Sequence, residues 1–253
     1  MELKQILEHH VVDQVWSWVS LGPLKLPLSK HLLMMGIASL IMLIGFPLLI
    51  RSRSAALAPF RAMLEMTVLF LRDEIVIPNL GHKGAAYVGY FSTLFFFILI
   101  LNLIGLVPYG ATATGNLAVT GGLAFTSFAL INFSGIKEQG LIGYISHLVP
   151  KGVPVWLYPL MFPIELMGMV IKTFALCIRL FANMIAGHIV ILVFISFIFI
   201  FGSFGVSIGL GVAPVSVGLV LFTLLLELLV AFLQAYVFVT LTAIFTGAAM
   251  HPH

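Results

Sequence analysis

Long apolar runs alternate with short polar segments along the whole chain of 253 residues. The first three runs cover residues 32–50, 85–107 and 116–133. Each is long enough, as a helix, to cross the roughly 30 Å hydrocarbon core of a lipid bilayer. The pattern therefore predicts three membrane spans in the first half of the chain.

Two longer apolar runs, residues 155–201 and 215–248, fill the second half. No proline follows Pro163 before Gly202, so the first run predicts a helix of roughly forty residues, about 55 to 60 Å long. That is longer than an upright span requires, so the helix either breaks near Gly187 or tilts steeply. We favour the tilt because no polar turn interrupts the run. The glycine-rich segment 202–214 then makes a hairpin of the two helices.

Two polar-apolar segments flank the first span. Residues 1–30 place Trp16 and Trp18 among polar residues at roughly helical spacing, which predicts an amphipathic segment at the membrane surface. Residues 55–82 contain too many charges for a span and predict a helix that lies along the inner surface.

The composition excludes a water-soluble fold. Hydrophobic residues make up 61% of the chain, charged residues make up 8%, and the mean hydropathy is +1.18. We predict one all-α integral membrane domain over residues 1–253, with about five membrane helices and additional interfacial helices. The last two helices form the long tilted hairpin.

The charges indicate orientation in the membrane. Arg51 and Arg53 directly follow the first span, which places this loop inside, the N-terminus outside and the C-terminus in the cytoplasm. The net charge of +3 fits this pattern and predicts no nucleic-acid partner. The first twenty residues lack the apolar core of a signal peptide, so we expect an uncleaved start. Cys177 is the one cysteine, which excludes an internal disulfide and a cysteine metal site; we predict no metal and no cofactor.

Polar side chains recur on one face of the first long helix. Glu165, Lys172 and Arg179 are spaced by seven residues, and Asn183 follows four residues later. At about 100° per residue, these positions share a narrow arc. His188 lies about half a turn away from Arg179. The second long helix has its own polar stripe, which contains Thr223, Glu227, Gln234 and also Leu241.

Arg179 is the most demanding of these residues. Arginine does not lose its proton in proteins, and a charge in the membrane costs from about 2.5 to above 10 kcal/mol. One interpretation is a permanent structural bridge to Glu227. The alternative is a carboxylate that another subunit supplies and exchanges.

The other polar groups fit a proton path. His188 and Glu227 can take up and release protons, whereas Asn183 and Gln234 can only form hydrogen bonds. All four are also compatible with simple interhelical hydrogen bonding between the two long helices. The sequence leaves both interpretations open.

Three segments resemble one known family. These are IRLFANMIAGH (residues 178–188), LLELLVAFLQAYVFVTLT (residues 225–242) and LNLIGLVPY (residues 101–109). Together they are similar to subunit a, the membrane stator subunit of the F-type rotary ATP synthase. The resemblance covers essentially the whole chain and implies a proton-translocating subunit without a catalytic site of its own.

The resemblance implies a role for each matching residue. Arg179 matches the arginine that meets the carboxylate of each passing subunit of the rotating c-ring, between two aqueous half-channels. Asn183 and Gln234 match polar residues that flank it, and His188 and Glu227 match a pair that lines the outer half-channel. Further candidates, with less defined roles, are Glu165, Lys172, Asn116 and Thr223.

The resemblance also implies partners and a location. The partners are the c-ring, the peripheral-stalk b subunits, the rest of the ATP synthase and the lipid bilayer. The expected location is a bacterial inner membrane rather than a mitochondrial one. The transported ion, H⁺ or Na⁺, depends largely on the ring, and the titratable His188 favours H⁺.

Two other classes of function need a test. A stand-alone secondary transporter would have an internal repeat with helices broken at matching positions, and the sequence contains neither feature. A purely structural membrane scaffold would use its intramembrane charges only to pair with each other. The effect of replacing Arg179 on ion transport distinguishes these classes.

Overall fold

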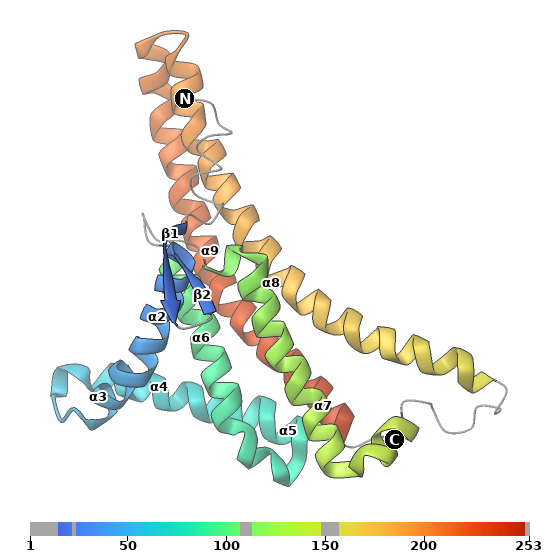
Figure 1. The fold of residues 1–253 in the computed structure, drawn as a ribbon. Helices are drawn as coiled ribbons and strands as arrows, with labels where there is room; N and C mark the ends of the chain where they lie inside the picture. The colour runs from blue at the N-terminus through green and yellow to red at the C-terminus, as the bar shows by residue number, and fades with distance from the viewer. Residues whose placement is uncertain (1–14, 22–23, 107–112, 148–156, 251–253) are drawn as a thin grey trace. The chain divides into compact units, whose positions relative to one another are not determined.

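The computed structural model describes residues 15–21, 24–106, 113–147 and 157–250 (Figure 1). Within these residues, five helical segments are long and apolar enough to cross a membrane. They cover Lys30–Arg51, Ala55–Leu106, Leu117–Tyr144, Leu160–Gly202 and Val206–Met250. The predicted all-helical membrane class, with about five membrane helices and two long C-terminal helices, is confirmed.

The N-terminal segment contains strands where the sequence predicted an amphipathic helix. Strand β1 (Val15–Leu21) pairs antiparallel with β2 (Leu24–Ser29), and Trp18 lies opposite Pro27. The helix prediction is wrong for these residues because valine and tryptophan in Val15–Leu21 favour strands, and leucine alternates with other residues at a period of two in Leu24–Ser29. Residues 1–14 of the predicted segment lie outside the described residues.

The region from residue 30 to residue 106 is helical except for a short break at residues 52–54. The first span comprises α2 (Lys30–Leu40), a π-helical turn η1 (Ile41–Gly45) and α3 (Phe46–Arg51). The predicted interfacial helix and second span are helical as expected. They comprise η2 (Ala55–Leu57), α4 (Ala58–Phe70), η3 (Leu71–Val76), α5 (Ile77–Leu80), η4 (Gly81–Tyr87) and α6 (Val88–Leu106).

The third span is longer than predicted. A short turn η5 (Ala113–Gly115) precedes α7, which covers Leu117–His147 instead of ending at residue 133. Gly140 interrupts α7 with a φ of 72°, so the helix changes direction there. Glycine adopts this left-handed conformation without the steric penalty of a side chain.

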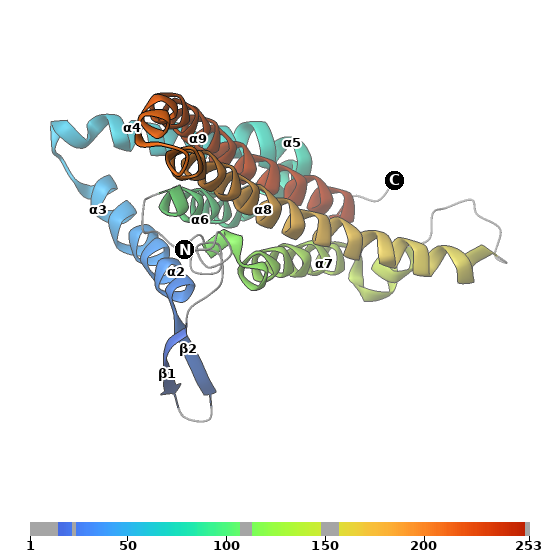
Figure 2. The ribbon, with the colours of Figure 1, turned by 90° about the horizontal axis from the view of Figure 1, so that it is seen from above.

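The two long helices are α8 (Tyr158–Gly202) and α9 (Val206–Met250). Helix α8 continues through Gly187, as we favoured. The turn between the helices is confined to residues 203–205, so the predicted turn over residues 202–214 is wrong for most of its length. Next to the turn the two helices run side by side (Figures 1 and 2). A Cβ atom on Gly209 would lie 2.7 Å from the Cα atom of Gly202, so the close approach requires glycine there.

The chain divides into two compact units, and both contain parts of α6, α8 and α9. The first unit consists of Met1–Ser39, Ile98–Val119 and Arg179–Gln234. The second unit consists of Leu40–Phe97, Thr120–Ile178 and Ala235–His253. Buried apolar side chains form a core in each: Leu101, Leu180 and Ala231 in the first, and Leu71, Ile75, Phe91, Phe95 and Phe238 among others in the second.

Candidate functional site

Arg179 lies on an exposed part of α8 in the first unit. It forms no ion pair with any residue that the structure describes, and the predicted alternative of a bridge to Glu227 is not formed. The adjacent Leu180 is buried, so α8 packs inward through its apolar side chains and leaves the guanidinium group outside. The charge is therefore available to a group from another molecule.

Asn183 and Gln234 join the two long helices one turn beyond Arg179. The amide nitrogen of Asn183 donates to Oε1 of Gln234 over 2.8 Å, and Gln234 is buried. The two side chains thus form an interhelical hydrogen bond, the contact that the structural interpretation of these residues predicted. This bond fixes how α8 and α9 pair beside Arg179.

His188 is anchored between α8 and α6. Its Nδ1 atom lies 3.0 Å from the carbonyl oxygen of Met184, and its Nε2 atom lies 3.2 Å from the carbonyl oxygen of Gly105. Carbonyl oxygens only accept hydrogen bonds, whereas a neutral imidazole ring has a single N–H group. In the neutral ring, therefore, only one of the two contacts is a hydrogen bond. Both contacts are hydrogen bonds when both ring nitrogens carry a proton.

Glu227 lies against the backbone of α8, where Gly187 leaves room for it. A Cβ atom on Gly187 would collide with a carboxylate oxygen of Glu227 and would come within 2.7 Å of the carboxylate carbon. Both carboxylate oxygens are buried, and no described residue donates a hydrogen bond to them. The carboxylate of Glu227 therefore lies beside Gly187, the residue that precedes His188 on α8, and the pairing of Glu227 with His188 stays a prediction.

Asn102 on α6 is a further buried polar residue of the first unit, and the sequence analysis missed it. Its Nδ2 atom donates to the carbonyl oxygen of Ala231 on α9 over 3.3 Å, and its Oδ1 atom accepts from the hydroxyl of Thr114 over 3.0 Å. Asn102 is 2% exposed. The signal in the sequence was a single asparagine within the apolar second span, but nothing in the sequence indicated its partners.

Two of the further candidates have local structural roles. Oδ1 of Asn116 accepts from the backbone N–H of Ala118 over 2.9 Å and so caps the start of α7. The hydroxyl of Thr223 is buried and donates to the carbonyl oxygen of Leu219, one turn earlier in α9. Neither contact involves the residues that surround Glu227.

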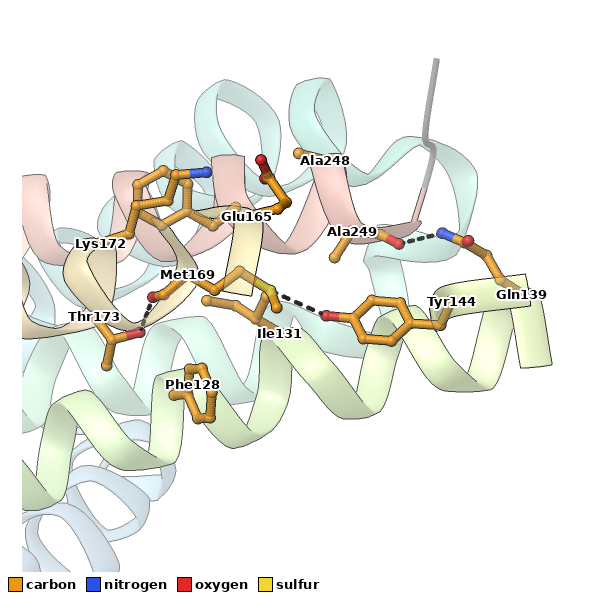
Figure 3. A pocket seen from close by; sticks show the side chains of 11 residues that line it. Phe128, Ile131, Gln139, Tyr144, Glu165, Met169, Lys172, Thr173, Ala248 and Ala249 are labelled. Atoms are coloured by element: carbon orange, nitrogen blue, oxygen red, sulfur yellow. Dashed lines mark hydrogen bonds between the residues drawn. The ribbon is translucent and has the colours of Figure 1, made fainter. Parts of the chain in front are cut away.

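Glu165 and Lys172 lie in the second unit, where they line a cavity of about 140 Å³ (Figure 3). The ammonium group of Lys172 lies 5.5 Å from the ring centroid of Phe245, at the distance of a cation–π contact. The cavity has room for a few water molecules, since each occupies about 30 Å³ in the liquid. The structure thus provides a mainly apolar cavity that also contains the charged side chains of Glu165 and Lys172, and the sequence analysis did not predict it.

The kinked end of α7 forms one wall of this cavity. The hydroxyl of Tyr144 lies 3.4 Å from Sδ of Met169 (Figure 3). It also lies 3.0 Å from Oδ1 of Asn132, so it donates to one of the two at a time. Gln139 donates to the carbonyl oxygen of Ala249 over 2.6 Å. The wall is therefore held to both α8 and α9 within the second unit. The described part of the chain contains no group of three or more metal-binding side chains.

Comparisons with known proteins identify relatives over most of the chain. A family model described as ATP synthase A chain matches residues 32–247. The chain is 46% identical over 233 residues to ATP synthase subunit a of Myxococcus xanthus, which covers 90% of this chain and 75% of that protein. It is 41% identical over 258 residues to ATP synthase subunit a of Chloroherpeton thalassium, covering 96% of this chain and 75% of the relative. It is 42% identical over 237 residues to ATP synthase subunit a of Anaeromyxobacter dehalogenans (strain 2CP-C), covering 92% of this chain and 60% of the relative.

Proposed function

Because the chain belongs to the ATP synthase subunit a family, a component of the F-type ATP synthase, we propose that it forms two aqueous half-channels beside a rotating ring of c subunits. Protons enter one half-channel, cross the membrane on the ring and leave through the other. The chain has several membrane-spanning helices and works as the proton-translocating stator subunit.

The exposed and unpaired Arg179 carries this proposal. The other polar side chains near it, Asn183 and Gln234, satisfy each other within the chain, whereas Arg179 has no anion among the described residues. A permanent cation in lipid requires a compensating charge. A carboxylate on each passing c subunit supplies that charge in turn.

The fixed cation also explains how ion flow drives rotation. A protonated carboxylate is neutral and can move through lipid, but it must release its proton and ionise when it meets Arg179. Arg179 blocks a direct path for protons between the half-channels. Each proton that crosses gains about 2.3 kcal/mol per 100 mV of membrane potential, and this energy turns the ring because the ring is the only complete route.

His188 and Glu227 are the proposed proton-exchanging groups of the outer half-channel. Glu227 has two buried oxygens to which no described residue donates, so no protein hydrogen bond holds this carboxyl group in one protonation state. His188 has acceptors placed for both of its ring nitrogens and can hold one proton or two without moving. The pair thus suits proton transfer between water and the ring.

The complex supplies the remaining functions. We propose that ATP is made on other subunits, that this chain has no catalytic site or cofactor, and that peripheral-stalk b subunits hold it in place. The proposed location is a bacterial inner membrane, with the N-terminus outside and the C-terminus in the cytoplasm. A stand-alone transporter and a membrane scaffold are the competing functions.

Replacement of Arg179 by alanine in the assembled complex tests the proposal. ATP-driven proton pumping into inverted vesicles should fall at least thirtyfold, since a hydrogen-bonded contact with a charged group contributes about 2 kcal/mol or more. The c-ring should still co-purify. Lys137→Ala, which removes another exposed positive charge, serves as the control and should pump normally.

Each competing function gives a different result. Normal pumping by the Arg179→Ala complex would refute the proposal and support a scaffold. Ion transport by the purified chain alone, in vesicles that lack the ring, would indicate a stand-alone transporter.

A further inference from the structure

Arginines surround the loop between α3 and α4, and this segment contains no acidic residue. Residues 51–61 read RSRSAALAPFR. Arg51 and Arg53 are exposed, and neither forms an ion pair with a residue that the structure describes. Arg61 donates from Nη1 to the carbonyl oxygen of Ser52 and ties the start of α4 to the loop. We call residues 51–54 the arginine loop.

Helix α4 presents three different faces behind this loop. At about 100° per residue, one face contains the partly buried Leu64 and Val68. The flank on one side of it is apolar and exposed: Phe60, Met63 and Met66 are 56%, 55% and 63% exposed. The flank on the other side contains exposed charged residues, namely Glu65 and, just beyond the end of α4, Arg72.

This arrangement fixes the depth of the arginine loop in the membrane. A helix with an apolar flank and a charged flank is stable where hydrocarbon meets water. The loop connects α4 to Arg51, the last residue of an apolar helical segment of 22 residues. Both neighbours therefore place Arg51 and Arg53 at the level of the lipid headgroups.

The chemistry at this depth favours a phosphate group. A guanidinium group matches two phosphate oxygens with two parallel hydrogen bonds. The nearest unpaired acidic residue along α4 is Glu65, on the charged flank, so the excess charge of the loop is not neutralised locally. The apolar flank of α4 begins directly after the loop, so a ligand with a phosphate joined to hydrocarbon chains matches both features.

We propose that the arginine loop and the apolar flank of α4 bind an anionic phospholipid such as phosphatidylglycerol. The phosphate contacts Arg51 and Arg53, and the acyl chains lie along Phe60 and Met63. This inference is independent of proton translocation, because it requires only that the chain is a membrane protein and that the second unit folds as described.

A tryptophan reporter next to the loop tests the proposal. The full chain carries Phe60→Trp, and its natural tryptophans, Trp16, Trp18 and Trp156, are replaced by phenylalanine. It is reconstituted into vesicles of phosphatidylcholine that contain a small fraction of brominated phosphatidylglycerol or brominated phosphatidylcholine. Bromine quenches tryptophan fluorescence only at close range, so quenching reports the lipid beside residue 60.

The arginines should determine which lipid is enriched. Each basic residue near an anionic surface contributes about a fivefold preference, so Arg51→Gln together with Arg53→Gln should lower the preference for phosphatidylglycerol about 25-fold. Arg53→Lys should retain most of the preference because it keeps the charge. Lys137→Gln is matched to Arg53→Gln in charge and exposure and should have no effect.

Several results would overturn the proposal. These are equal quenching by the two brominated lipids in the reporter chain, an unchanged preference in the double glutamine variant, or an equal loss in the Lys137→Gln control. Quenching by brominated phosphatidylcholine must stay constant in all variants, because this signal confirms that α4 remains folded in the membrane. The last experiment adds inorganic phosphate, or chloride at the same ionic strength, and measures the preference for phosphatidylglycerol again. If phosphate abolishes this preference and chloride does not, the loop binds free phosphate and not a lipid.

Discussion

Replacing Gly187 by alanine should separate helix stability from proton translocation. Alanine is favoured over glycine inside a helix by about 0.5 to 1 kcal/mol, so α8 alone would gain stability. In this structure the new Cβ atom would meet the carboxylate of Glu227, whose carbon would be only 2.7 Å away. The carboxylate, which is the end of a flexible side chain, must therefore move out of its buried position.

These opposing effects determine how much Gly187→Ala changes the stability of the chain. Overpacking in a filled interior costs about 1 to 3 kcal/mol, so the variant should be between neutral and about 2 kcal/mol less stable than the wild-type chain. Proton pumping should fall more steeply, at least tenfold, because the carboxylate of Glu227 leaves the buried position beside Gly187 from which we propose it exchanges protons. Pumping is measured as ATP-driven acidification of inverted vesicles, and stability as the thermal unfolding of the purified complex.

Gly168→Ala is the matched control, because Gly168 also lies within α8 and a Cβ atom there would meet nothing within 4 Å. It should leave pumping unchanged and leave stability equal or slightly higher. Combining Gly187→Ala with Glu227→Asp shortens the acid and should restore part of the pumping. Equal pumping by the Gly187→Ala and Gly168→Ala complexes would refute the proposed position of Glu227.

Two further predictions concern packing in the two units. Gly247→Ala should destabilise the chain by about 2 kcal/mol or more, because the new Cβ atom would collide with the backbone of Asn79, which yields less readily than a side chain. The exposed control Gly89→Ala, which has open space at its Cβ, should unfold at an equal or slightly higher temperature. Asn102→Ala should cost about 1 to 3 kcal/mol by leaving the Thr114 hydroxyl and a backbone carbonyl without their partner. A double-mutant cycle with Thr114→Val measures this coupling, and independent effects of the two changes would contradict the hydrogen bond.

The spans were predictable because lipid imposes a simple requirement on the sequence. A membrane helix needs a long apolar run, and this signal is stronger than any local preference of single residues. The turn between α8 and α9 was less predictable. Membrane helices tolerate glycine and proline. Pro214 and the glycines before it therefore lie within the first turns of α9 and do not interrupt it. Only residues 203–205 leave the helix.

The hairpin of β1 and β2 was missed for a different reason. Val15–Leu21 contains few residues, and helical spacing and strict alternation both fit part of it. Over so short a segment, the period-two alternation and the β-branched and aromatic residues are better guides than the apolar positions. The prediction gave too much weight to the tryptophans as a sign of an interfacial helix.

At the candidate site, the ionisable residues were predictable from the sequence and their packing was not. Arg179, His188 and Glu227 could be identified from the sequence because ionisable residues in apolar runs are rare and expensive. The role of Gly187 could not, because a glycine has no chemistry of its own, and its importance depends on which atom of a distant helix approaches it. The partners of Asn102 on α9 and near α7 were unpredictable for the same reason.

The neighbours Gly187 and His188 show why both kinds of information are needed. Both ring nitrogens of His188 lie within hydrogen-bonding distance of backbone carbonyls, one on α8 and one on α6. Glu227 has no hydrogen-bond donor among the described residues, and only the missing side chain at position 187 allows it to lie there. The imidazole of His188 is thus positioned by the backbone of two helices. The carboxylate of Glu227 has no such hydrogen bond among the described residues and can reorient. We propose that this difference suits proton exchange, whereas a structural ion pair would restrain both groups.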